Sequence, residues 1–271
     1  MKKNIMLLIT AFSIVLLSGC MTNTISNEAS TEDTLSVSAS ETVSNDSAEK
    51  DEVLNADKTT ENYYTEDSRI QDVAGDPAFG DYGRLIFPVN SGYMSGNTIG
   101  DLHLTWYNYI DPDKTVEICN YMRDHAESGD TIFYDIYTDE EKVADSDKVN
   151  TGLFFFKGNP GEKFAIVNAG GGFAYVGAMH DSFPHALELS KMGYNAFALI
   201  YRPGAQTACE DLARAIAYIF EHADELEVDT SDYSLWGGSA GGRMAAWLGT
   251  YGTERFGEKQ YPRPAAVIVN Y

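Results

Sequence analysis

Positive charge is scarce in this sequence. It holds 19 lysines and arginines against 41 aspartates and glutamates, which gives a net charge of −22 at pH 7. That balance argues against binding to nucleic acid and against direct electrostatic attachment to anionic lipid. Much of the negative charge lies between residues 27 and 72, in a stretch rich in serine and threonine with few apolar side chains. We expect a disordered tether there, because such a composition cannot bury a core.

The N-terminus has no apolar run long enough for a membrane span, which needs about 20 residues. Its run from Ile5 to Leu17 is shorter, and two lysines precede it. This arrangement predicts an export signal. The four residues Leu17-Ser18-Gly19-Cys20 resemble the lipobox of bacterial lipoproteins, which implies a lipidated Cys20 as the first mature residue. The alternative is an ordinary secretory signal with a chance cysteine.

A lipid on Cys20 would hold an exported protein at the cell membrane or cell surface without a spanning helix. We therefore expect a signal peptide over residues 1–19, a tether over 20–75 and a globular domain over 76–271. The residue pattern over 79–150 does not decide whether this segment forms a lid or extends a sheet.

Cysteine is also rare, with three in the chain. Beside Cys20 there are Cys119 and Cys209, both at apolar positions of helical patterns. They are either small buried hydrophobic residues, which is the commoner role, or a disulfide pair. The sequence contains neither a C-x-x-C pair nor histidines at the spacing of metal ligands, so it supports no metal site. It implies no organic cofactor.

Strand and helix patterns alternate in the second half of the chain. A helix is expected over 114–127, with an apolar stripe of Val116, Cys119, Met122 and Ala126, followed by strands over 131–137 and 152–156. Further strands are expected over 164–168, 194–201, 233–236 and 265–270, separated by helices over 182–192, 207–226 and 240–251. This order predicts an α/β fold with a mostly parallel sheet and helices on both faces.

The motif Gly237-Gly238-Ser239-Ala240-Gly241 lies between an expected strand and an expected helix. A G-x-S-x-G elbow turns sharply and holds its serine in a strained backbone conformation, and its glycines remove side chains that would collide. The Ser239 hydroxyl would stand above the sheet, with the Ala240 N–H directed to a developing oxyanion. The alternative is a tight glycine turn without chemistry.

A second glycine motif, Asn168-Ala169-Gly170-Gly171-Gly172-Phe173, follows the strand over 164–168. Consecutive glycines expose backbone N–H groups, which an oxyanion hole needs. We select Gly171 and Gly172 as donors, with Ala240 as the third. The loop could instead hold phosphate, but neither the G-x-G-x-x-G spacing nor a Gly-Lys-Ser/Thr ending is present.

These motifs, together with Tyr201-Arg202-Pro203 and Asp211, resemble the α/β-hydrolase esterases of the hormone-sensitive-lipase-like and carbohydrate-esterase branches over residues 151–271. The resemblance implies an α/β-hydrolase fold, Ser239 as nucleophile, an oxyanion hole of Gly171, Gly172 and Ala240, and structural roles for Arg202 and Asp211. One departure is Ala169, where these esterases often carry histidine. This change puts the anchoring of the loop in doubt.

No histidine follows Ser239; all five precede it. In α/β-hydrolases the acid and the histidine come after the nucleophile. We therefore expect a C-terminally incomplete domain whose last strands are missing. As it stands it should be nearly inactive, because losing a triad histidine removes most turnover. The alternative is a rearranged site in which His180 or His185 is the base.

The sequence thus predicts a serine esterase that cleaves a small-molecule or carbohydrate ester through an acyl-serine intermediate. Two other functions stay open: a serine exopeptidase of the prolyl-oligopeptidase type, and a non-catalytic surface lipoprotein that binds ligands on a hydrolase scaffold. For the latter, the candidate sugar-stacking residues are Tyr63, Tyr64, Tyr93, Trp106, Tyr107 and Tyr109, although core or loop packing is their commoner role.

Overall fold

The computed structural model describes residues 63–270. These residues belong to one compact unit. The expected signal peptide, Cys20 and residues 20–62 of the expected tether lie outside the described residues. Within residues 63–270, no helix has the length and apolar character needed to cross a bilayer.

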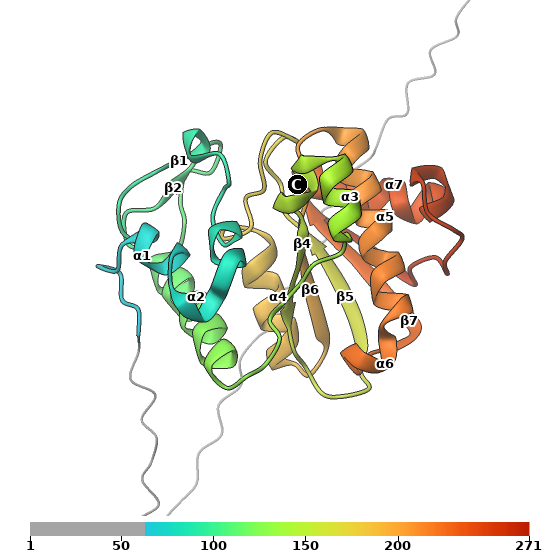
Figure 1. Cartoon of the computed structure of the whole chain (residues 1–271), viewed down its shortest axis with the longest axis horizontal. Helices are drawn as coiled ribbons and strands as arrows, with labels where there is room; N and C mark the ends of the chain where they lie inside the picture. Colours follow the sequence, from blue (N-terminus) through green and yellow to red (C-terminus); the bar gives the residue numbers. More distant parts are fainter. Residues whose placement is uncertain (1–62, 271) are drawn as a thin grey trace, which may run out of the picture. The chain divides into compact units, whose positions relative to one another are not determined.

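A six-stranded sheet forms the centre of this unit (Figure 1). Two antiparallel pairings join β3 to β4 and β4 to β6, and the pairings of β6 with β5, β5 with β7 and β7 with β8 are parallel. The expected α/β fold with a mostly parallel sheet is therefore confirmed. In spatial order the strands are β3 (Phe133–Tyr134), β4 (Gly152–Phe156), β6 (Asn195–Ile200), β5 (Lys163–Asn168), β7 (Asp229–Gly238) and β8 (Ala266–Asn270).

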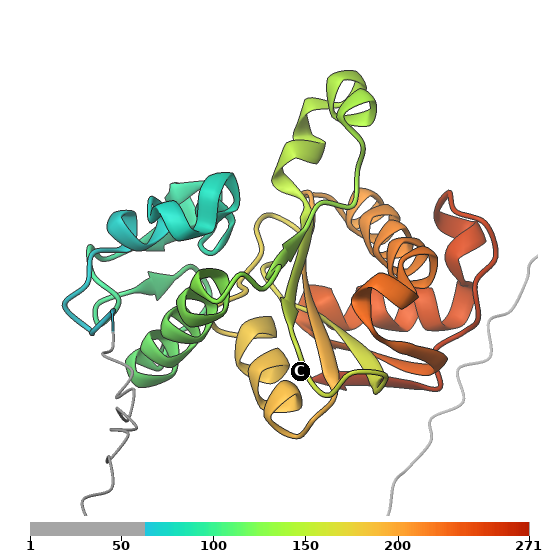
Figure 2. The same ribbon diagram turned by 60° about the horizontal axis from the view of Figure 1, so that its bottom comes forward.

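Helices lie on both faces of the sheet (Figures 1 and 2). Helix α4 (Ser182–Lys191) covers one face, and α5 (Ala205–Glu221) and α7 (Ser239–Tyr251) cover the other. The connection from β5 to β6 crosses the sheet in the opposite direction to those from β6 to β7 and from β7 to β8. Right-handed crossovers therefore place α4 opposite α5 and α7.

The expected single helix over 207–226 is two helices. It divides into α5 and the short α6 (Ala223–Leu226), because His222 leaves helical geometry at φ −114° and ψ 21°. The expected strand over 131–137 is shortened to β3, and the charged segment after it forms α3 (Asp139–Ala144) and a 3-10 helix over Ser146–Asn150.

The segment before the sheet is folded rather than extended. It contains α1 (Ile70–Ala74), a 3-10 helix over Pro77–Leu85, and another over Ser91–Tyr93. A two-stranded sheet of β1 (Met94–Ser95) and β2 (His103–Leu104) precedes α2 (Pro112–Glu127). A further 3-10 helix, Thr253–Phe256, lies between α7 and β8.

The tether was expected to reach residue 75, and this boundary is wrong. Tyr64 is buried, and its backbone N–H and carbonyl bond to the side chain of Asn120 at 2.9 and 3.0 Å. Ile70 and Val73 on α1 are also buried. These few apolar residues suffice because α2 and the neighbouring 3-10 helix supply a surface for them, which local composition does not reveal.

The core runs along both faces of the sheet, and β4, β5 and β6 are buried almost throughout. On α2, Cys119 and Met122 of the expected stripe are buried, whereas Val116 and Ala126 are half-buried and Ile118 joins the core instead. Cys119 and Cys209 are both free and buried. Their role is therefore that of small core residues, and the alternative of a disulfide is wrong.

Candidate active site

Ser239 lies where β7 ends and α7 begins. Its φ is +47°, a conformation that is strained for a residue with a side chain. The residue is exposed to solvent. The strand-to-helix context and the strained backbone are both as the elbow motif predicts.

The two outer glycines of the motif are required by close backbone contacts. A Cβ on Gly237 would lie 2.2 Å from the carbonyl carbon of Gly241. A Cβ on Gly241 would lie 1.9 Å from the carbonyl oxygen of Asn168. The first turn of α7 thus packs directly on the end of β5, where the second glycine motif begins.

The glycine loop follows β5 at the same edge of the sheet. Parallel pairing sets Asn168 opposite Gly237, so both loops leave the carboxyl ends of neighbouring strands. A Cβ on Gly170 would lie 3.2 Å from the Ser239 Cβ. The structure therefore brings together the two motifs that the sequence selected.

Backbone geometry in the loop leaves donors available. Gly171, Gly172 and Phe173 have φ values of +130°, +62° and +60°. Within residues 63–270, no hydrogen bond uses the N–H of Gly171 or Gly172. The Ala240 N–H lies in the first turn of α7, where backbone donors have no helical partner. Gly171, Gly172 and Ala240 are the three donors that we selected from the sequence.

The loop is anchored although Ala169 stands where the esterases that this motif resembles often carry histidine. The N–H of Gly170 donates to Asp181 Oδ2 at 2.8 Å, and Tyr201 Oη donates to the Ala169 carbonyl at 2.7 Å. The N–H of Gly177 donates to the Gly170 carbonyl at 2.9 Å. Hydrogen bonds from other residues therefore anchor the loop without a histidine at position 169.

Asp181 is a site residue that the sequence did not reveal. It occupies the N-cap position of α4, where an aspartate ordinarily caps the helix, yet its side chain makes no capping bond. The carboxylate instead lies beside the elbow, since a Cβ on Gly238 would be 2.4 Å from its Oδ2. Burial raises the pKa of Asp181, against the lowering effects of the Gly170 N–H and of His185 and His180.

His180 and His185 were the alternative bases. The ring of His180 packs on Tyr107, with centroids 4.1 Å apart, and desolvation lowers its pKa. His185 Nδ1 donates to the backbone carbonyl of Asp181 at 2.6 Å. No hydrogen bond within residues 63–270 joins either histidine to Ser239, so this geometry does not support the rearranged site.

Two aromatic residues from the loop between β2 and α2 reach the glycine motif. Tyr107 Oη would lie 2.5 Å from a Cβ on Gly170, and the Trp106 ring 2.9 Å from a Cβ on Gly172. Burial, with a further contribution from Asp181, raises the pKa of Tyr107, which keeps its hydroxyl protonated. The segment over 79–150 therefore adds β3 to the sheet and also forms one wall of the site.

A second wall comes from α7. Phe173 stacks on Trp247 with ring centroids 6.4 Å apart, and the Arg243 guanidinium lies 5.8 Å from the Trp247 ring centre. Arg243 is exposed and stands four residues after Ser239. A cation and an aromatic pair thus lie on the α7 side of the elbow that holds Ser239.

The six aromatic residues proposed for sugar stacking do not form one surface. Tyr64 is buried against α2, and Tyr63 Oη donates to Glu127 Oε2 at 2.6 Å on that helix. Only the members from the loop region, Tyr93, Trp106 and Tyr107, lie near the glycine motif or pack on one another.

Arg202 and Asp211 form a buried ion pair. The Asp211 carboxylate accepts from Arg202 Nη2 at 2.7 Å and from the Arg202 backbone N–H at 2.7 Å. Tyr137 Oη donates to the same carboxylate at 2.7 Å. These contacts fix the turn between β6 and α5, in agreement with the structural roles that the resemblance implied.

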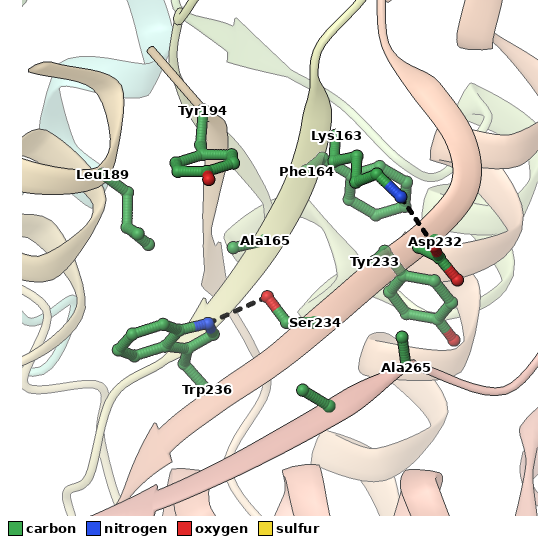
Figure 3. A pocket seen from close by; sticks show the side chains of 11 residues that line it. Lys163, Phe164, Ala165, Leu189, Tyr194, Asp232, Tyr233, Ser234, Trp236 and Ala265 are labelled. Atoms are coloured by element: carbon green, nitrogen blue, oxygen red, sulfur yellow. Dashed lines mark hydrogen bonds and ion pairs between the residues drawn. The ribbon is translucent and has the colours of Figure 1, made fainter. Parts of the chain in front are cut away.

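A separate cavity of about 340 Å³ lies on the α4 side of the sheet, over β5, β7 and β8 (Figure 3). Leu189 and Tyr194 border it near α4, and Trp236 donates from Nε1 to Ser234 Oγ at 2.9 Å on its floor. Lys163 and Asp232 form an ion pair at 2.6 Å at its other end. Neither Ser239 nor the glycine loop lines this cavity, so it is not the site of the motif chemistry.

Residues 157–267 match the BD-FAE family model, a segment that includes the glycine loop, Asp181 and Ser239. Together with the elbow geometry and the strand order, this match decides the fold. The described chain has an α/β-hydrolase fold. The hydrolase motifs selected from the sequence thus occur in the structural context that they require.

Solved structures of esterases and hydrolases also match the chain. Native thermophilic esterase 2 of Thermogutta terrifontis is 26% identical, over 45% of this chain and 49% of that one, with a TM-score of 0.41. MGS-M1, an α/β hydrolase from a Medee basin deep-sea metagenome, is 25% identical, over 45% and 51%, with a TM-score of 0.37. This chain spans about half the length of these structures. A search of curated proteins gave no match.

Proposed function

We propose that this protein hydrolyses carboxylic esters through an acyl intermediate on Ser239. One observation carries the proposal: a serine in a strained elbow, at φ +47°, stands beside a loop whose Gly171 and Gly172 N–H groups have no acceptor within residues 63–270. A nucleophile next to free, fixed donors is the arrangement that acyl transfer needs.

In the first step, Ser239 Oγ attacks the ester carbonyl carbon and loses its proton to a base. The carbonyl oxygen becomes an oxyanion, which accepts hydrogen bonds from the N–H groups of Gly171, Gly172 and Ala240. Each such donor typically contributes about 2.7 to 4 kcal/mol to stabilising the transition state. The C–O bond to the alcohol then breaks, the alcohol takes a proton, and water releases the acid in a second cycle.

The base is not assigned to a residue of this sequence. In α/β-hydrolases an acid and then a histidine follow the nucleophile, and residues 240–271 contain no histidine. We therefore propose that residues 1–271 alone turn over ester very slowly.

Covalent labelling tests the nucleophile. The full-length gene product is treated with a fluorophosphonate, and the modified peptide is located by mass spectrometry. We expect labelling at Ser239 and its loss in Ser239→Ala. Ser234→Ala is the matched control, because Ser234 lies on the same strand but faces the separate cavity, and it should label normally. A folded full-length protein that does not label would refute the proposal.

For the substrate we propose an acyl group on a carbohydrate or another small ester. The support is analogy: an exported lipoprotein meets external polymers, and the hydrolase motifs resemble carbohydrate esterases. A panel of acetylated sugars, short aryl esters and dipeptide amides separates the possibilities. Cleavage of dipeptide amides without ester cleavage would favour an exopeptidase instead.

We also propose that Cys20 carries a lipid that anchors the exported protein. The support is the sequence from Lys2 to Cys20. Metabolic labelling with a radioactive fatty acid in the native host should mark the wild-type protein and not Cys20→Ala. Cys119→Ala is the matched control, and persistent labelling of Cys20→Ala would contradict the anchor.

A further inference from the structure

Trp106 combines exposure with backbone strain. Its side chain is 65% exposed, and its φ is +72° in the loop between β2 and α2. A bulky residue rarely adopts this conformation, because it strains the backbone. A tryptophan needed only for packing would be buried, so neither feature is explained by the core.

Two tyrosine rings support the indole ring of Trp106. Tyr93 and Tyr175 stack on each other with centroids 4.8 Å apart and planes 14° apart, and Trp106 packs on both at 6.2 and 5.7 Å. Tyr175 Oη also donates to the Thr105 carbonyl, next to Trp106 in the chain. The exposed ring is therefore a supported surface rather than a free side chain.

The same ring borders the proposed oxyanion hole. A Cβ on Gly172 would lie 2.9 Å from Trp106 Cζ3 and 3.2 Å from Cη2. Gly172 is itself exposed, and its N–H is one of the proposed donors. A substrate whose carbonyl oxygen meets this N–H would extend a neighbouring group over the indole.

We propose that Trp106, supported by Tyr93 and Tyr175, is a stacking subsite for a ring attached to the scissile ester. The location of the ester rests on the proposed function, and the ring subsite goes beyond it. The ligand is a group with a flat apolar face, either an aromatic ring or the C–H face of a pyranose, for which indole is a suitable partner. Linear acyl or alkyl groups gain little from such a surface.

Equilibrium binding tests the subsite without any reaction at Ser239. In the full-length Ser239→Ala protein, calorimetry measures the Kd of phenyl butyrate and of n-hexyl butyrate, which carry a ring or a linear chain of equal carbon number. Adding Trp106→Ala should weaken phenyl butyrate binding about three- to tenfold, the range that aromatic contacts provide. Hexyl butyrate binding should change less than about twofold.

Trp106→Phe keeps a flat ring and should retain most of the affinity for phenyl butyrate, while it guards against a folding defect in Trp106→Ala. Tyr109→Ala is the matched control, because Tyr109 is also 65% exposed in the same segment. Equal weakening of phenyl butyrate and hexyl butyrate binding would overturn the subsite, and so would the absence of any effect of Trp106→Ala on ring-bearing esters, the pyranoside ester below included. Failure of fluorophosphonate labelling would instead refute the acyl-serine mechanism, so the two failures are distinct.

Two classes of ring are then separated with the same proteins. Phenyl butyrate is replaced by an acylated methyl pyranoside, and Trp106→Ala is compared with Trp106→Phe. If Trp106→Ala weakens binding of the pyranoside ester, the surface accepts a sugar ring. If it weakens binding of the phenyl ester alone, the surface accepts an aromatic ring. Both results support the ring subsite, and absence of both overturns it.

Discussion

Asp181 Oδ2 accepts a hydrogen bond from the N–H of Gly170 at 2.8 Å. The same carboxylate borders the nucleophile elbow, since a Cβ on Gly238 would lie 2.4 Å from Oδ2. One side chain at the start of α4 therefore touches both the loop with the proposed oxyanion donors and the strand end that precedes Ser239. Asp181 is in this sense a positioning residue for both parts of the site.

Removing that contact should misplace the donors. Asp181→Ala leaves the Gly170 N–H without its acceptor, and we expect the rate of fluorophosphonate labelling to fall about tenfold to a hundredfold, somewhat less than the loss of a whole oxyanion donor. Asp181→Asn keeps an amide oxygen as acceptor and should label within a few-fold of the wild type. Equal rates for Asp181→Ala and the wild type would show that the loop holds its shape without this bond.

Asp181 should also make stability depend on pH. Burial raises its pKa in the folded state, so the folded protein binds this proton more readily than the unfolded chain. The protonated Asp181 carboxyl contributes to the free energy of unfolding below the pKa of about 3.9 that it has in the unfolded chain. This contribution is lost as the pH rises through its higher pKa in the folded protein. Asp181→Asn removes the buried charge, so its Tm should exceed the wild-type Tm by more at pH 8 than at pH 4.

The size of this effect is measurable. A gain of about 1 kcal/mol corresponds to roughly 2 to 4 °C for a domain of this size. Thermal unfolding of the two proteins across this pH range provides the comparison, with Asp139→Asn as control because Asp139 is exposed. A Tm difference that does not change with pH would contradict a raised pKa for Asp181.

The elbow and the glycine loop could be predicted from sequence because their requirements are local. Gly237 and Gly241 are needed where backbones nearly touch, and Ser239 is strained because of the turn itself. The central strands β5 and β6 were also predicted, because their continuous apolar residues belong to strands buried on both faces. The fold of the half that holds both glycine motifs follows from these signals.

The contacts of Asp181, Trp106 and Tyr107 could not be predicted in the same way. An aspartate before a helix ordinarily indicates a cap, and only the packing of α4 beside Gly170 turns it toward the loop. Trp106 and Tyr107 lie more than 60 positions before the glycines that they contact. Such pairings depend on the course of an irregular segment, which periodicity does not specify.

The buried ion pair of Arg202 and Asp211 offers a test of stability that does not involve Ser239. Asp211 is fully buried and receives bonds from Arg202 and Tyr137. Asp211→Ala leaves the guanidinium without its main partner, so we expect a loss of about 3 to 5 kcal/mol in the free energy of unfolding. Urea denaturation measures it, and Glu210→Ala, one position away and more exposed, should change stability by less than about 0.5 kcal/mol.

The last prediction concerns the close approach of α7 to β5. A Cβ on Gly241 would lie 1.9 Å from the Asn168 carbonyl oxygen, which belongs to a central strand and cannot move without breaking its pairing. Gly241→Ala should therefore destabilise the protein by about 3 kcal/mol, at the upper end for overpacking, and should shift Ser239 enough to abolish labelling.

Gly249→Ala in the same helix is the matched control. Its Cβ would meet the Val267 side chain at 2.6 Å, and Val267 is 39% exposed on the edge strand β8, so its side chain can turn away. Alanine is also the better helix former by about 0.8 to 1 kcal/mol. Gly249→Ala should thus be near neutral in chemical denaturation and label normally. If both alanine variants behave alike, the contact between α7 and the end of β5 does not position the nucleophile.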